Sequence, residues 1–372
     1  MNVLERTRPI ASTLPPLAVQ IERDRTPPAD VMAGLARAGA FRMLVPAALG
    51  GEEVLPIELV EVVEQVARGD ASTGWCVMVG ATAGLMAAYM EEDGAREVFA
   101  DPDTITCGVF APLGRAEAHG DGYRVSGRWP FASASHHARF RMGGAVVEGK
   151  RDILHVVLRA EETTLLDTWH TSGLRGTGSD DMVAEGVLVP RSRTLRLVGG
   201  SPRHEGVLYK FPMYGLLALG VSAVATAIAQ QALAAFSALA TAKTPAFSRK
   251  PLAHQDAVAV DVAACEASLG AARAYVREVT LEATRRAELD GALSLALRAR
   301  LRAAATHATR TAADTTSRVY EAAGGSAIYD TSPFQRHLRD VLVATQHAMV
   351  SRSSLTLAGR VMLGVDTDTS ML

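Results

Sequence analysis

The richest chemistry in this sequence lies in residues 122–138, which read GYRVSGRWPFASASHHA. The aromatic residues Trp129 and Phe131 are followed by small hydroxyl residues, among them Ser133, and then by two adjacent histidines. Aromatic rings beside a small hydroxyl suit a flat conjugated ligand, because the rings stack on it while the hydroxyl and nearby amides bond its edge heteroatoms. A barrel strand with core aromatics and a serine-rich turn has the same composition, so these residues alone leave both interpretations open.

A second stretch, residues 171–179, reads TSGLRGTGS. Its glycines let the backbone approach a ligand closely, and Arg175, Thr177 and Ser179 offer hydrogen-bond donors to an anionic or carbonyl group. An ordinary turn has a similar composition. The stretch matches neither a phosphate loop nor a dinucleotide fingerprint opening a helix, and the chain has no strand–GxGxxG–helix unit, which excludes a Rossmann domain.

A third stretch begins at Gly324-Gly325 and continues with Arg336, Arg339 and Asp340 on the helix predicted to follow. Paired glycines and guanidinium groups suit contacts to a phosphate. A helix–turn–helix connection with a surface salt bridge is the alternative interpretation.

His347 lies seven residues after Asp340, so a continuous helix places both residues on one face. The ordinary pKa of histidine suits general acid–base chemistry near neutral pH. A histidine on an apolar helix face is also often a satisfied core residue, so the position alone does not decide its role.

Three regions of different periodicity must position these residues. Apolar residues recur at helical spacing through the first hundred residues, short alternating or β-branched runs occupy residues 104–190, and the helical pattern returns at Pro212. The predicted strands are residues 122–131, 139–147, 153–158 and 182–189, and the predicted long helices are residues 213–242, 252–288, 292–322 and 333–363. Long helices joined by short breaks must pack side by side. We therefore predict a mainly α protein with a β middle domain: helices over 1–103, a small β-barrel or sandwich over 104–200, and an antiparallel four-helix bundle over 201–372.

The overall composition excludes several classes of protein. A net charge of −2 gives no basic surface for a nucleic acid. The three cysteines, Cys76, Cys107 and Cys265, have no metal-like spacing, so we expect reduced thiols in a cytoplasmic protein and no metal site. The N-terminal residues lack the apolar core of a secretory signal. Residues 211–242 carry no charge and are long enough to span a bilayer, but they lack an aromatic belt and basic flanks, so we predict the innermost bundle helix and no membrane contact.

The order and spacing of these stretches resemble the acyl-CoA dehydrogenase superfamily over essentially the whole chain. Further matches are LARAGAFRMLVPAALGG (35–51), RGDASTGW (68–75), GLRGTGSDDMVAEGVLVP (173–190) and the GG…P…R…RD pattern over residues 324–340. The resemblance implies an N-terminal helical domain, a small β-barrel and a C-terminal antiparallel four-helix bundle. It also implies a flavin bound between the β domain and the bundle, in a homotetramer or dimer.

Carried over by position, the resemblance implies which residues hold the flavin. Residues 131–133 match the segment at the flavin N5 edge, and residues 110–114 match the preceding loop over the ring. The nucleotide portion, usually held from the neighbouring subunit, corresponds to Gly324 and Gly325 with Phe247 and with Lys243 or Arg249. Together with the motif residues above, the expected flavin-binding set is Phe110, Ala111, Pro112, Trp129, Phe131, Ala132, Ser133, Arg175, Thr177, Ser179, Lys243, Phe247, Gly324 and Gly325.

The chain departs from the dehydrogenases of this superfamily at one decisive position. An acyl-CoA dehydrogenase needs a glutamate that removes the α-proton of its substrate, and the commonest position for it holds Ala348 here. The alternative position, in residues 214–217, holds no carboxylate either. Without such a base, the proton of an α,β-dehydrogenation has no route.

His347, next to that position, is similar to the branch of two-component flavin monooxygenases, which hydroxylate phenols, oxidise sulfur heterocycles or oxidise amino-sugar nitrogens. The resemblance implies reduced FAD or FMN supplied by a separate reductase, with oxygen as the co-substrate. It implies that Ser133 protects the reactive flavin and that His347 steers a proton or orients the substrate. Thr82 stands where some members carry a further histidine, which argues against a phenol-type site.

We therefore expect a flavin-dependent monooxygenase with His347 and Ser133 as its catalytic residues and a small aromatic, polycyclic or amino-sugar-like substrate. Two alternatives remain open from the sequence. One is an acyl-CoA or acyl-carrier thioester dehydrogenase with FAD and an unrecognised base. The other is a non-redox member of the superfamily that serves as a scaffold or catalyses dehydration or cyclisation.

Overall fold

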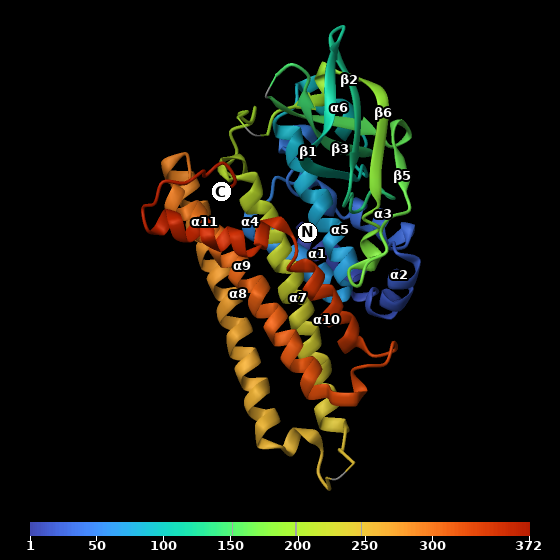
Figure 1. Cartoon of the computed structure of the whole chain (residues 1–372), viewed down its shortest axis with the longest axis vertical. Helices are drawn as coiled ribbons and strands as arrows, with labels where there is room; N and C mark the ends of the chain where they lie inside the picture. The colour runs from blue at the N-terminus through green and yellow to red at the C-terminus, as the bar shows by residue number, and fades with distance from the viewer. Residues whose placement is uncertain (151, 198, 247) are drawn as a thin grey trace.

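The computed structural model describes residues 1–150, 152–197, 199–246 and 248–372. Figure 1 shows a β sheet at one end of the molecule, the N-terminal helices packed beside it, and a bundle of long helices that extends to the opposite end. The chain is therefore mainly helical with a β region in the middle, which confirms the predicted fold class.

The N-terminal region is built around one central helix, α5, whose residues are all buried. Asp70 caps this helix, because its carboxylate accepts a hydrogen bond from the main-chain N–H of Thr73 at 2.7 Å. Helix α5 packs against α4, β1 and α7 and so connects the three regions. The helices of this region are α1 (Val3–Ser12), α2 (Ala18–Asp24), α3 (Ala29–Arg37), α4 (Pro56–Gly69), α5 (Ala71–Gly84) and α6 (Glu92–Phe99).

The β region forms one sheet with the strand order β5-β6-β2-β1-β3-β4-β7. Strands β1 and β3 are parallel, and the other neighbouring pairs are antiparallel. The four predicted strands are confirmed as β2, β3, β4 and β6, whereas the long first strand was not predicted. The strands are β1 (Thr106–His119), β2 (Gly122–Trp129), β3 (Phe140–Val147), β4 (Ile153–Arg159), β5 (Thr164–Leu166), β6 (Asp181–Pro190) and β7 (Thr194–Leu195).

Trp129 is the centre of the sheet's own core. Its side chain is fully buried, and its Nε1–H donates to the carbonyl oxygen of Gly144 at 2.7 Å. A Cβ atom at Gly114, Gly127 or Gly143 would lie 2.4, 2.7 or 2.6 Å from the indole ring, so only glycine fits beside it. The expectation that Trp129 contacts the flavin is therefore wrong, because protein atoms enclose the ring.

Long helices form the C-terminal region, and the first three agree with the predicted ranges to within a few residues. They are α7 (Met213–Ala242), α8 (Asp256–Asp290) and α9 (Leu295–Ala323), followed by the shorter α10 (Pro333–Ala344) and α11 (Arg352–Met362).

The predicted fourth bundle helix, residues 333–363, is wrong as a single helix. Helix α10 ends at Ala344, a short 3-10 turn follows at Ala348–Val350, and α11 then begins. His347 breaks the helix because its backbone is extended (φ −64°, ψ 131°) and its side chain caps the turn. Asp340 and His347 consequently do not share a helix face.

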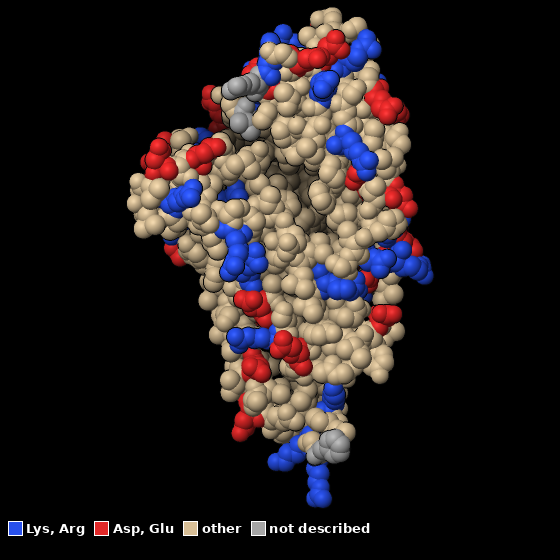
Figure 2. All heavy atoms as spheres, in the orientation of Figure 1, with Lys and Arg blue, Asp and Glu red and all other residues tan. Residues whose placement is uncertain are grey.

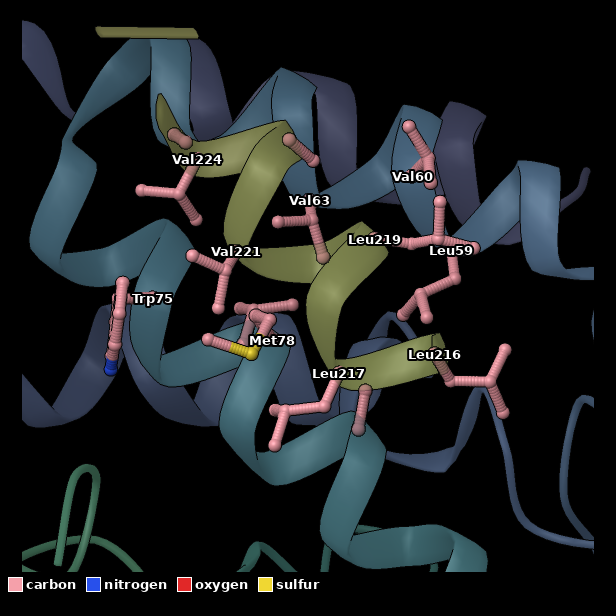
Figure 3. Packing of buried hydrophobic residues seen from close by; sticks show 14 of the residues in the cluster. Leu59, Val60, Val63, Trp75, Met78, Leu216, Leu217, Leu219, Val221 and Val224 are labelled. Carbon is pink, nitrogen blue, oxygen red and sulfur yellow. The ribbon is translucent and has the colours of Figure 1, made fainter. Parts of the chain in front are cut away.

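Helix α7 is buried along most of its length. Figure 3 shows its residues Leu216, Leu217, Leu219, Val221 and Val224 among side chains of α4 and of α5. Each fully buried side chain of this size contributes about 1.5–3 kcal/mol through removal from water. Both α7 and the segment Ala71–Ala88 are long and apolar enough to cross a membrane, and both are mostly buried inside the protein, which accounts for their composition.

Candidate active site

The turn after β2 packs directly on the loop that precedes β6. The main-chain N–H of Ala132 donates to the carbonyl oxygen of Asp180, and that of Ala134 donates to the carbonyl oxygen of Thr177, both at 3.2 Å. The structure thus brings together two stretches that the sequence analysis selected separately.

Strained backbone marks the same place. Phe131, Ala134 and Leu174 have φ angles of +66°, +63° and +48°, in the left-handed region that disfavours a residue with a Cβ atom. Of the other described non-glycine residues, only Arg25 and Glu53 share this conformation. Such strain persists where the surrounding structure fixes the backbone, and it concentrates at functional sites.

A chain of buried hydroxyl groups runs through this contact. The indole Nε1–H of Trp75 donates to Ser133 Oγ at 3.1 Å, and Ser133 Oγ lies 2.7 Å from Ser179 Oγ. Ser179 Oγ lies 2.7 Å from Thr177 Oγ1, which donates to the carbonyl oxygen of Leu174 at 2.8 Å. Ser133, Thr177 and Ser179 are all buried. Three residues of the expected flavin-binding set therefore form one hydrogen-bonded unit with Trp75.

The groups around this unit suit a flavin. Phe131 is 68% exposed although it is aromatic, and its ring meets that of Trp169 edge-on with the centroids 6.1 Å apart. The Nε atom of Arg175 is buried and has no hydrogen-bond partner among the described residues. A ring face, a free guanidinium nitrogen and a hydroxyl cluster are what a flat heteroaromatic cofactor with polar edges requires. Figure 2 shows the surface hollowed between the β sheet and the helices.

His347 reaches this cluster from the break between α10 and α11. Its ring meets that of Trp75 edge-on, with the centroids 5.6 Å apart and the planes at 68°. Its Nδ1 accepts a hydrogen bond from the main-chain N–H of Met349 at 3.3 Å, which assigns the proton of the neutral imidazole to Nε2. Burial, together with the positive charge of Arg302, lowers the pKa of His347 to about 4. The ordinary pKa expected from the sequence is therefore wrong here, and His347 is arranged to donate a hydrogen bond from Nε2.

Arg302 of α9 holds the turn that carries His347. This buried guanidinium donates to Ser354 Oγ at 2.9 Å and to the carbonyl oxygen of Met371 at 2.5 Å. Ser354 Oγ in turn lies 3.3 Å from the carbonyl oxygen of Ala348. Nothing in the sequence distinguishes Arg302, because it is one of several arginines in the same helical stretch.

Comparison with known proteins identifies the family. Residues 5–98 match the model of the acyl-CoA dehydrogenase N-terminal domain, and residues 219–352 match that of the acyl-CoA dehydrogenase C-terminal domain. The chain is 31% identical to the indole-3-acetate monooxygenase of Pseudomonas putida over 349 residues, which cover 93% of this chain and 89% of that protein. It is 28% identical to the oxygenase component of the FADH2-dependent resorcinol hydroxylase of Rhizobium sp. (strain MTP-10005), with 98% and 95% coverage.

The chain belongs to the acyl-CoA dehydrogenase family, in its branch of flavin-dependent monooxygenases. The crystal structure of the 3-HSA hydroxylase from Rhodococcus sp. RHA1 superposes with a TM-score of 0.94 and 25% sequence identity, and it covers 100% of this chain and 99% of that one.

The loss of the dehydrogenase base is visible in this monooxygenase. Ala348, at the position of the expected glutamate, is exposed and begins the short 3-10 turn. Among the described residues, no carboxylate is hydrogen-bonded to Trp75, Ser133 or His347. The geometry therefore supports the chemistry of the monooxygenase branch.

The segment expected as a loop over the flavin ring is part of strand β1. The strand bulges there, because its register against β3 shifts on both sides of Pro112. The bulge leaves Ala111 and Pro112 exposed and Phe110 half-buried. The freed carbonyl oxygen of Phe110 lies 3.2 Å from Nε2 of His155, whose pKa burial lowers to about 4. The loop expectation is thus wrong, although the bulge still presents these residues at the surface.

The residues expected around the nucleotide portion lie at the far end of the bundle. Lys243 Nζ donates to the carbonyl oxygen of Ala323 at 2.9 Å, beside Gly324 and Gly325. Helix α7 passes α5 at Gly220, where Met78 packs against it, and about 35 Å of helix separates that point from Lys243 at 1.5 Å per residue. Phe247 lies outside the described residues.

Asp340 and Arg339 of α10 bind other parts of the protein rather than standing free for a phosphate. Asp340 Oδ1 accepts the main-chain N–H of Leu174 at 2.6 Å, and Arg339 pairs with Glu22 at 2.6 Å. A Cβ atom at Gly173 would lie 2.3 Å from the carbonyl oxygen of Arg339, so this close approach requires glycine. Burial raises the pKa of Asp340 to about 7.

Sequence reasoning missed Trp75 as a site residue. The motif RGDASTGW was recognised, but its tryptophan received no role. Trp75 is the one large residue in the helical stretch ASTGW, and its contacts with Ser133 and His347 make it the connection between the β region and the bundle at the site.

Proposed function

We propose that this chain is the oxygenase component of a two-component system, which takes reduced flavin from a separate reductase and oxygenates a small aromatic substrate. One oxygen atom of O2 enters the substrate, the other leaves as water, and the reduced flavin supplies the two electrons. The observation that carries the proposal is the arrangement around Trp75, with Ser133 on its Nε1 and His347 beside its ring, and with no carboxylate of the described residues hydrogen-bonded to these three.

In this proposal, each residue of the site has a separate role. When a flavin is bound, Ser133 would face its N5 edge, Arg175 would contact its polar edge, and Phe131 would cover part of its ring. His347 donates its Nε2 proton in a hydrogen bond to the substrate or to the oxygen being transferred, because its Nδ1 is already occupied. Asp340 keeps the loop of Leu174 in place.

The names of two relatives support an aromatic substrate, since one is an indole-3-acetate monooxygenase and the other a resorcinol hydroxylase. We favour FAD as the flavin, because Lys243, Gly324 and Gly325 converge on a second polar site that FMN, which lacks the adenylate half, would leave unused. The length of α7 between Gly220, where it passes α5, and Lys243 supports a homo-oligomer in which one subunit holds the far half of a neighbour's flavin. Three buried free cysteines support a reducing, cytoplasmic location.

The test is a single-turnover reaction with labelled oxygen. The protein is loaded anaerobically with chemically reduced FAD, mixed with ¹⁸O₂ and either indole-3-acetate or resorcinol, and the products are analysed by mass spectrometry. One ¹⁸O atom per product molecule is the expected result. Reoxidation without labelled product for any member of a panel of aromatic compounds, combined with bleaching of oxidised FAD by an acyl-CoA, would assign the chain to the dehydrogenases instead.

A further inference from the structure

The hydroxyl chain at Ser133 has a direction, because its two ends are chemically different. At one end, the indole Nε1–H of Trp75 is a donor only. At the other end, the carbonyl oxygen of Leu174 is an acceptor only, and it takes the single hydroxyl proton of Thr177.

The positions of the intermediate protons follow from these ends. Since Thr177 has given its proton to Leu174, its 2.7 Å contact with Ser179 uses the proton of Ser179. The 2.7 Å contact between Ser179 and Ser133 must then use the proton of Ser133. Ser133 accepts from Trp75, donates to Ser179, and retains one free lone pair and no free proton.

The main-chain amides of the turn do not change this count of donors and acceptors at Ser133. The N–H groups of Ala132, Ser133, Ala134 and Ser135 donate to carbonyl oxygens of the protein, at 3.2, 2.9, 3.2 and 3.2 Å. These four amides are therefore already used within the protein. Toward a ligand at Ser133, the turn offers an acceptor.

We infer that this directed chain is the device by which the site selects reduced over oxidised flavin. The inference rests on the proposed function, in which Ser133 faces the flavin N5. Reduced flavin carries hydrogen on N5 and can donate to the free lone pair of Ser133, whereas oxidised flavin presents a lone pair at N5. Two facing lone pairs leave a buried acceptor unsatisfied, and one such loss corresponds to roughly a tenfold to hundredfold difference in affinity.

The test compares dissociation constants for oxidised and reduced FAD, the latter measured anaerobically, in the full-length protein and two variants. Ser179→Ala removes the acceptor for the Ser133 proton, which becomes free to donate to N5. Oxidised FAD should then bind about tenfold tighter while the affinity for reduced FAD stays nearly constant. Thr177→Val should also tighten the binding of oxidised FAD. Without the hydroxyl of Thr177, Ser179 can donate to Ser133 instead, and the proton of Ser133 becomes free to donate to N5.

Two control variants isolate the direction of the chain from general disturbance of the turn. Thr177→Ser keeps the hydroxyl that donates to Leu174 and should retain the wild-type ratio of affinities. Ser135→Ala removes a buried hydroxyl of the same turn that has no hydrogen-bond partner among the described residues, and it should also leave the ratio unchanged.

The possible outcomes separate the inference from the proposed function. If wild-type protein binds both redox forms equally, or if Ser179→Ala and Thr177→Val fold and keep the wild-type ratio, the inference is wrong even where labelled oxygen enters the substrate. If the ratio shifts as expected but no substrate is oxygenated, the hydroxyl chain selects reduced flavin and the proposed function fails. Absence of binding in either redox state overturns both.

Discussion

The two regions expected to hold the flavin are organised in opposite ways. At the ring-edge region, Ser133, Thr177 and Ser179 are buried, and each makes hydrogen bonds within one chain. At the far-end region, Gly324 and Gly325 lie in open space, and Lys243 is anchored to the end of α9. The first region has a fixed geometry before any ligand arrives, whereas the second is an open surface.

This difference indicates which part of the cofactor each region controls. A reactive edge needs groups placed in advance, because a misaligned donor or acceptor loses most of its effect. A nucleotide tail needs only charge and open backbone, and a surface shared between subunits can supply these. We therefore expect substitutions in the ring-edge region to change chemistry and redox preference, and substitutions in the far-end region to change affinity for FAD alone.

The largest effect is expected for His347, which reaches the ring-edge region from the helical bundle. His347→Ala should leave folding and flavin binding nearly intact but lower the rate of substrate oxygenation by roughly 10²- to 10³-fold, the range for loss of one preorganised hydrogen-bond donor. Single-turnover product analysis measures this. His307→Ala, at an exposed position of α9, is the matched control. Wild-type turnover in His347→Ala would show that the histidine only caps its turn.

Asp340 of α10 holds the loop of the ring-edge region through Leu174, and its substitution should change how the stability of the protein depends on pH. The folded protein raises the pKa of Asp340 to about 7 from 3.8, so the folded state holds its proton longer than the unfolded state does. Stability therefore falls as the pH rises from about 4 to 7, by on the order of 3 kcal/mol at about 1.4 kcal/mol per pKa unit.

Asp340→Asn keeps the acceptor for Leu174 and removes the charge. The variant should have a higher melting temperature than the wild type at pH 8, and this advantage should shrink toward pH 4. Asp366→Asn, at an exposed position, is the control that should show no such dependence. A constant difference between the two proteins from pH 5 to 8 would exclude titration of Asp340 as the cause.

The far-end region can be tested by placing a negative charge at a glycine with open surroundings. A Cβ atom at Gly325 would meet no atoms within 4 Å, so Gly325→Glu should leave the melting temperature unchanged. Affinity for FAD should fall about tenfold, corresponding to about 1.4 kcal/mol, while affinity for FMN should stay constant because FMN lacks the adenylate portion. Gly270→Glu, also in open space, serves as the control. An equal loss of affinity for FAD and FMN would contradict the distinction between the two regions.

The smallest effect is expected for Arg302, which holds the turn that carries His347. Arg302→Met removes the hydrogen bond to Ser354 and the charge that helps to lower the pKa of His347, so this pKa should rise from about 4. Imidazole NMR signals over a pH series measure the change, and oxygenation should slow by less than about tenfold. Arg298→Met, which loses the described hydrogen bonds to Leu372, should leave the titration of His347 unchanged.

The sequence predicted most of the helices and four strands because their apolar periodicity is local. It also predicted that residues 131–133 and 175–179 matter, although it could not show that they touch. It failed where the long-range environment overrides local pattern. Trp129 is core because glycines of β1, β2 and β3 make room for its ring, and a bulge interrupts the strand through Phe110.

The sequence by itself determined the order of the three regions and the absence of a dehydrogenase base at Ala348, since both are properties of residue type and spacing. Only the tertiary structure decided the state of His347 and the direction of the hydroxyl chain. A pKa depends on burial and on a charge such as that of Arg302, which lies 45 positions away along the chain. The direction of a hydrogen-bond chain depends on its end groups, and the fold alone placed Trp75 and Leu174 at the two ends.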